Sequence, residues 1–173
     1  MVLDRLDREE LPTQSHPLLG RPSLHASLIE GGVGLSTYPE RCILKVERRT
    51  LPGERDADVF AEFEQAAGRV RTERPEFSFA VRSLFAQPPS DVAADAPIVE
   101  ALASVVSEQG LDAQLEGMSA WTDAALLNAA GVPAICFGPG DMGLAHAAEE
   151  YIDTLEIERA TEILVSLAQR WCS

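Results

Sequence analysis

The sequence predicts a protein of mixed helices and strands, with an α+β first half and an α/β second half. Two segments of alternating apolar and polar residues precede a helix-period segment, which is typical of an antiparallel hairpin packed with a helix. Later, short apolar runs alternate with helical patterns, which favours a parallel α/β layer. The periodicity stops between the halves at residues 87–97 (QPPSDVAADAP), so we place the boundary there.

The first half is predicted to run α-β-β-α-β. Met1 to about Glu10 has the spacing of a short helix, but it starts without a capping residue, so we expect that preceding chain is missing. Ser23–Glu30 and Arg41–Thr50 alternate as half-buried strands do. Residues 52–73 predict a helix with early acids and late arginines, as the helix dipole favours. Residues 76–87, rich in aromatic and branched side chains, predict a third strand.

The second half is predicted to contain three helices and two strands. The helical patterns cover residues 98–109, 122–130 and 155–171. Short strands are expected at 113–116 and 133–137. The second of these, PAICF, is apolar throughout, as a strand covered on both faces should be.

Composition limits the classes of partner. A hydrophobic content of 46% with 24% charged residues is that of a globular protein, and a net charge of -14 disfavours nucleic acid and anionic membrane surfaces. The three cysteines form no C-x-x-C pair, which argues against a disulfide framework or a cysteine zinc site. No apolar run is long enough for a membrane span, and we expect a cytoplasmic protein.

His146 is the first candidate site residue. It follows the predicted strand 133–137 and the turn Gly138-Pro139-Gly140, at the sheet edge where α/β proteins bind ligands. A neutral imidazole there suits zinc, with Glu149 or Glu150 accepting from its other ring nitrogen. The alternative is a loop histidine that only bonds the backbone, because one histidine does not make a metal site.

Two further pairs of residues could have either a functional or a purely structural role. Thr122 or Asp123 is expected to cap the following helix, although Asp123 also lies near the edge that holds His146. Arg48 and Arg49 are adjacent in a predicted strand and so point to opposite faces. One of them either faces a cleft and binds a substrate carboxylate or is an ordinary surface arginine.

In order along the chain, three segments resemble a known family: HPLLGRPSLHASLIEGG, STYPERCILKVERRTLPGE and WTDAALLNAAGVPAICFGPGDMGLAHAAEEYI. They are similar to the carboxyl-terminal part of the zinc metallopeptidases and deacylases that include acetylornithine deacetylase, succinyl-diaminopimelate desuccinylase, aminoacylase and carboxypeptidase G. The resemblance implies a ferredoxin-like lid and dimerisation domain at residues 1–90, without its first strand. It implies the last part of a zinc-peptidase-like α/β domain at residues 95–173.

The resemblance also implies chemistry. In this family two zinc ions share a carboxylate and a water, a glutamate is the general base, and hydroxide attacks the amide of an N-acyl amino acid or small peptide. His146 matches the final metal ligand, and Arg49 matches a lid arginine that holds the substrate carboxylate. Gly138, Pro139 and Gly140 match the loop near that carboxylate.

The sequence departs from the family pattern in ways that restrict the prediction. The other metal ligands and the catalytic glutamate belong to a region before the lid that this sequence does not show, and Ser36 stands where an asparagine is expected. We therefore expect a truncated hydrolase with no catalytic residue of its own, inactive alone, that oligomerises or needs an amino-terminal half to cover apolar faces. The alternatives are a non-catalytic dimerisation or carboxylate-binding module, and an unrelated α/β protein.

Overall fold

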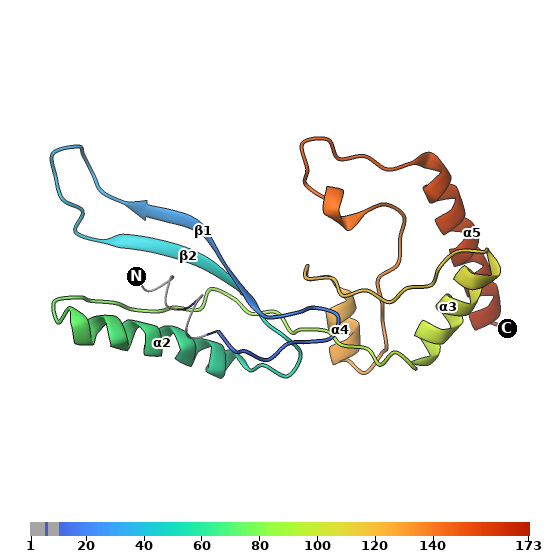
Figure 1. Ribbon diagram of the computed structural model, residues 1–173, viewed down its shortest axis with the longest axis horizontal. Coiled ribbons are helices and arrows are strands. Elements are labelled where there is room, and N and C mark those ends of the chain that lie inside the picture. The colour runs from blue at the N-terminus through green and yellow to red at the C-terminus, as the bar shows by residue number, and fades with distance from the viewer. Residues whose placement is uncertain (1–5, 7–10) are drawn as a thin grey trace. The chain divides into compact units, whose positions relative to one another are not determined.

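The computed structural model describes Leu6 and residues 11–173, and the chain divides into two compact units (Figure 1). The first comprises the described residues up to Pro89 together with Gly117–Trp121, and the second comprises Ser90–Glu116 and Thr122–Ser173. Each unit has its own buried side chains. The two units are therefore described separately.

An antiparallel hairpin forms the sheet of the first unit. It consists of β1 (Ser23–Gly31) and β2 (Cys42–Arg49), with Ser23 opposite Arg49 at one end. The register shifts between Ala26 and Leu28, which is a bulge that increases the local twist. Both strands predicted from the alternating pattern are confirmed.

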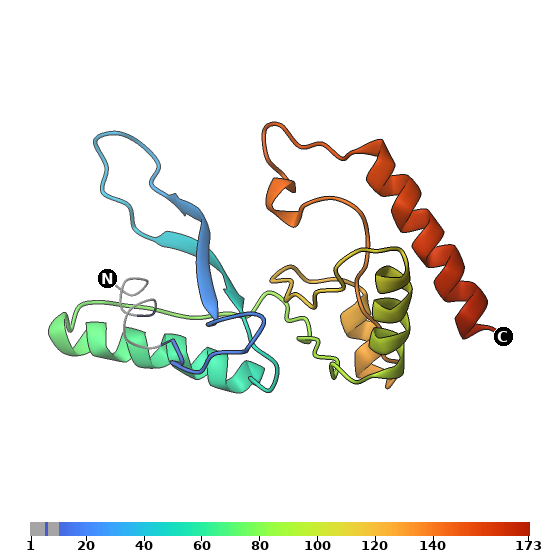
Figure 2. The ribbon, with the colours of Figure 1, turned by 45° about the vertical axis from the view of Figure 1, so that its right-hand side comes forward.

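The helix α2 (Asp56–Glu73) confirms the predicted helix of the first half. Acidic residues lie in its first turn and Arg71 lies in its last, which complements the helix dipole. Its buried face is narrow and consists of Ala66, Ala67 and Val70. In Figures 1 and 2 the helix runs beneath the hairpin.

The third predicted strand of the first unit, over residues 76–87, is wrong. The chain there runs back along α2 without regular structure (Figures 1 and 2), and the only sheet among the described residues has two strands. A strand needs a neighbouring backbone with which to bond. Here a side chain contacts the segment instead, since Arg71 Nη2 donates to the carbonyl of Phe79 at 2.7 Å.

Two helices form the core of the second unit, α3 (Pro97–Glu108) and α5 (Thr154–Trp171). Arg170 of α5 donates two hydrogen bonds to the carboxylate of Glu108 on α3, at 2.7 and 2.9 Å. Asp153 caps α5 by accepting from the Leu155 amide at 2.9 Å. The buried cluster between the helices consists of Leu102, Val105, Val106 and Ile163.

The remaining helices of the second unit are short. They are α4 (Ala124–Ala129) and the 3-10 turn η2 (Met142–Leu144). With α3 and α5, α4 confirms the three predicted helices of the second half. No helix in the described part of the chain is both long and apolar enough to cross a membrane.

The two strands predicted in the second half are wrong as strands. Residues 113–116 and 133–137 have no ladder partner in the described chain, so no parallel layer forms there. Their apolar side chains are nevertheless used, because Ala113 and Ile135 pack against the helical core. The apolar side chains of these segments therefore correctly predicted contact with the core, but they wrongly predicted strands.

The fold is mixed α/β, with a two-stranded sheet and helices in both units. The ferredoxin-like lid, and the domain ranges 1–90 and 95–173 with their roles, stay predictions. The helix expected over residues 1–10 lies outside the described residues except for Leu6, whose side chain is fully buried.

Candidate functional site

Arg49 ends β2 with its side chain partly exposed. Its Nε donates to Glu47 Oε1 at 2.6 Å, and its Nη1 donates to Ser119 Oγ at 3.1 Å. Glu47 lies two residues earlier on the same face of the strand, as the period of two requires. Ser119 belongs to the stretch Gly117–Trp121, which joins the first unit from far along the sequence.

Gly117 explains how that stretch approaches the first unit so closely. A Cβ at this position would overlap the backbone of Leu18. Only glycine permits this approach without a shift of the backbone. The close contact places Ser119, two residues later, beside Arg49.

Arg48 points to the opposite side from Arg49 and is 4% exposed. Its Nη2 donates to Glu54 Oε1 at 2.6 Å and to Glu62 Oε1 at 3.0 Å, and its Nε donates to Glu62 Oε2 at 3.1 Å. Burial acts to lower the pKa of Arg48, but the hydrogen bonds and charges of Glu62 and Glu54 outweigh it and raise the pKa. Arg48 is therefore a permanent buried cation, and the prediction that the two arginines face opposite ways is confirmed.

The Gly-Pro-Gly loop is held by a glutamate of α5. The amide of Gly140 donates to Glu156 Oε2 at 2.9 Å. Gly140 has a φ of 93°, a conformation that favours glycine, and a Cβ there would lie 3.3 Å from the Ile152 side chain. Gly138 has neither constraint. The loop thus depends on its second glycine.

His146 lies in an exposed turn after η2 and has a φ of 65°. Few residues other than glycine adopt this left-handed conformation. Its amide donates to Glu150 Oε2 at 3.2 Å. We expected Glu149 or Glu150 to accept from a ring nitrogen, but Glu150 bonds the backbone, so it orients the turn rather than the imidazole.

The described residues do not form a metal site. Among Leu6 and residues 11–173, no group of three or more His, Cys, Asp or Glu side chains is placed to hold a metal ion. A catalytic zinc needs about three protein ligands. His146 is therefore at most one ligand, and the residues present do not by themselves fit a zinc ion.

Thr122 and Asp123 do not have the capping role that we expected. Asp123 occupies the cap position of α4 with helical backbone angles, and α4 has no side-chain cap. The hydroxyl of Thr122 instead lies 3.3 Å from Cys136 Sγ, within hydrogen-bonding distance. These residues link the start of α4 to the segment before the Gly-Pro-Gly loop.

Asn128 holds the segment before the Gly-Pro-Gly loop, and this contact was not predicted from the sequence. Its Nδ2 donates to the Ala134 carbonyl and its Oδ1 accepts from the Ala134 amide, both at 2.8 Å, and Nδ2 also donates to Ser90 Oγ at 2.6 Å. The side-chain amide of Asn128 thus bonds both backbone groups of Ala134, as a partner strand would. An asparagine one helical turn before Gly-Val-Pro was the available signal.

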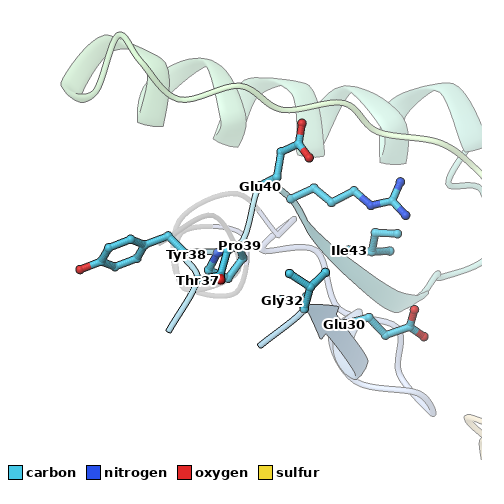
Figure 3. A pocket seen from close by; sticks show the side chains of 10 residues that line it. Glu30, Gly32, Thr37, Tyr38, Pro39, Glu40 and Ile43 are labelled. Atoms are coloured by element: carbon cyan, nitrogen blue, oxygen red, sulfur yellow. The ribbon is translucent and has the colours of Figure 1, made fainter. Parts of the chain in front are cut away.

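A hollow of about 550 Å³ lies at the turn of the β1–β2 hairpin (Figure 3). Its lining comprises residues 30–33, 37–41 and Ile43. Figure 3 shows Tyr38 pointing away from the other labelled side chains, and this residue is 97% exposed. None of the candidate site residues lines this hollow, so it is not the proposed substrate site.

The fold is that of a mixed α/β protein with a two-stranded sheet and helices in both units. Its distinctive side chains are an arginine at a strand end and a histidine after a Gly-Pro-Gly loop. The model of Peptidase family M20/M25/M40 matches residues 13–170, and the chain belongs to that family. The alternative of an unrelated α/β protein is therefore wrong.

Three relatives illustrate the membership. An acetylornithine deacetylase of Myxococcus xanthus is 26% identical over 87% of this chain and 38% of its own length. An N-formyl-4-amino-5-aminomethyl-2-methylpyrimidine deformylase of Bacillus subtilis is 26% identical over 99% of this chain and 44% of its own. An N-acetyl-L-citrulline deacetylase of Xanthomonas campestris is 40% identical over 24% of this chain and 12% of its own. The chain thus spans less than half the length of these relatives.

Proposed function

We propose that this chain carries substrate-binding residues and one metal ligand of a zinc-dependent amide hydrolase for N-acyl amino acids or small peptides. The observation that carries the proposal is the family match over residues 13–170. Relatives over most of this chain are named as a deacetylase and a deformylase, enzymes that remove an acyl group from nitrogen. We also propose that the metal is zinc and that the protein is cytoplasmic.

Arg49 is the residue that we propose binds the substrate carboxylate. Its side chain is 36% exposed, and its Nη2 has no hydrogen bond to the described residues. A guanidinium with a free edge suits a carboxylate, which accepts two parallel hydrogen bonds. We also propose that Gly138, Pro139 and Gly140 contribute to substrate binding, and that His146 is one metal ligand.

We further propose that the chain alone does not hydrolyse amides. The described residues offer one candidate ligand in His146 and no group of three. His146 alone does not provide the ligands that a catalytic zinc needs. The residues of this chain would hold and orient the substrate, and the remaining ligands would come from another chain segment or subunit.

Titration with N-acetylglycine and with N-acetylglycinamide, which lacks the carboxylate, tests the role of Arg49. The wild-type chain should bind N-acetylglycine more tightly than the amide, and Arg49→Ala should remove that difference. Arg55→Ala is the matched control, because Arg55 is an exposed arginine paired with Asp58 in the same unit. Equal binding of both probes by the wild type would contradict the proposed role.

Zinc binding tests the role of His146. Calorimetry should detect no tight, stoichiometric zinc site in the chain alone, and any weak binding should fall in His146→Ala. Release of acetate from N-acetyl-L-ornithine should stay at the background rate. Tight zinc binding with acetate release would refute the proposal that the chain is inactive alone.

A non-catalytic dimerisation module is the second candidate. Apolar side chains on the hairpin are exposed, including Ile29 at 73% and Val33 at 91%, and both strands have an unpaired edge among the described residues. Such an edge favours pairing with a second copy. Sedimentation should then show a homodimer that Ile29→Lys weakens, whereas a monomer at all concentrations would refute this candidate.

A further inference from the structure

Arg48 forms a buried ionic network that the proposed function does not use. The side chains of Glu54 and Glu62 that enclose it are only 14% and 12% exposed. Three charged groups in so little solvent must bond one another, because each is costly to bury alone. The network is therefore a fixed structure, in contrast to the exposed ion pair of Arg55.

The network binds the backbone at Arg49 and shortly after it. Arg48 Nη1 donates to the carbonyl oxygen of Arg49 at 2.6 Å. The Glu54 carboxylate that binds Arg48 also accepts from the amide of Leu51. Through Glu62 the same guanidinium is tied to α2. The chain around Arg49 thus has little freedom to turn about the strand axis.

Adjacent strand residues point to opposite faces, so a fixed Arg48 determines where Arg49 points. On that opposite face Glu47 and Ser119 hold two of the three guanidinium nitrogens of Arg49. We propose that Arg48, held by Glu54 and Glu62, is a positioning residue that orients Arg49 toward a substrate carboxylate. This inference rests on the proposed carboxylate-binding role of Arg49.

Stability alone gives a poor account of the network. Replacing a buried ion pair by apolar side chains of similar volume is often neutral or stabilising. The guanidinium of Arg48 has five N–H donors in a fixed plane. It can therefore fix the direction of the backbone carbonyl that it binds, which an apolar contact cannot do. Lysine keeps the charge of Arg48 but has a single nitrogen, so Arg48→Lys separates orientation from charge.

The experiment compares the wild-type chain with two variants, Arg48→Lys and Arg55→Lys. The second makes the same substitution at an exposed ion pair. The first measurement is the NMR signal of the Arg49 Nε–H, assigned by its loss in Arg49→Lys. The second is the ratio of dissociation constants for N-acetylglycinamide and N-acetylglycine. Glu62→Gln is the additional variant if Arg48→Lys does not fold, since Glu62 contacts Arg48 and not Arg49.

In Arg48→Lys the Arg49 signal should shift toward that of a free arginine, and N-acetylglycine should bind about tenfold more weakly, the loss expected for one hydrogen bond to a charged group. Arg55→Lys should change neither. A folded Arg48→Lys, or Glu62→Gln in its place, with an unchanged Arg49 signal and unchanged binding ratio would overturn the inference. A shifted signal without any carboxylate preference in the wild type would support positioning and refute the proposed function instead.

Discussion

Ile163→Ala is expected to destabilise the second unit by about 3 kcal/mol. Ile163 is 2% exposed and packs with Leu102, Val105 and Val106 between α3 and α5. The substitution removes three carbons, worth about 0.8 kcal/mol each in transfer free energy, or about 2.4 kcal/mol together. The cavity left behind adds to this, which places the total within the range of about 2–5 kcal/mol measured for such changes.

Urea unfolding followed by circular dichroism would measure the loss, and hydrogen exchange would locate it. The amides of α3 and α5 should exchange faster in Ile163→Ala. Leu164→Ala is the matched control, because Leu164 is the next residue of α5 and is 47% exposed. A loss below about 1 kcal/mol for Ile163→Ala, the level of an ordinary surface substitution, would refute the assignment of this core.

Two further predictions concern the second unit. The hydrogen bonds from Arg170 lower the pKa of Glu108, so their contribution is present above the unfolded pKa and is lost as pH falls through the lower folded pKa. The difference in melting temperature between wild type and Arg170→Gln should thus be present at about pH 7 and shrink below about pH 4.3; a constant difference would exclude the mechanism. Gly140→Ala should cost about 1–3 kcal/mol in melting experiments because of its φ of 93°, and Gly138→Ala should be close to neutral; equal effects would contradict the loop geometry.

The sequence predicted the elements whose signals are local. Helical periodicity located α2, α3 and α5, and period-two alternation located both strands of the hairpin. Because adjacent residues of a strand point to opposite faces, the sequence also predicted that the side chains of Arg48 and Arg49 would lie on opposite faces. Each of these inferences needs only the chain's own geometry within a few residues.

Features that depend on distant partners could not be predicted in the same way. Residues 133–137 read as a buried strand because apolar runs do not reveal whether a ladder partner is present. The contact between Arg49 and Ser119 joins residues 70 positions apart. The partner of Glu150 was the backbone of His146, which no spacing rule distinguishes from its ring.

The hydrogen bonds between Asn128 and Ala134 also occupy backbone groups that another strand could otherwise bind. Apolar segments such as residues 133–137 are hazards for aggregation when another chain can bond their backbone. Here both backbone groups of Ala134 are already bonded to one side chain, and Pro133 has no amide hydrogen to offer. An incoming strand would therefore have to displace the Asn128 side chain before it gained hydrogen bonds to the backbone of Ala134.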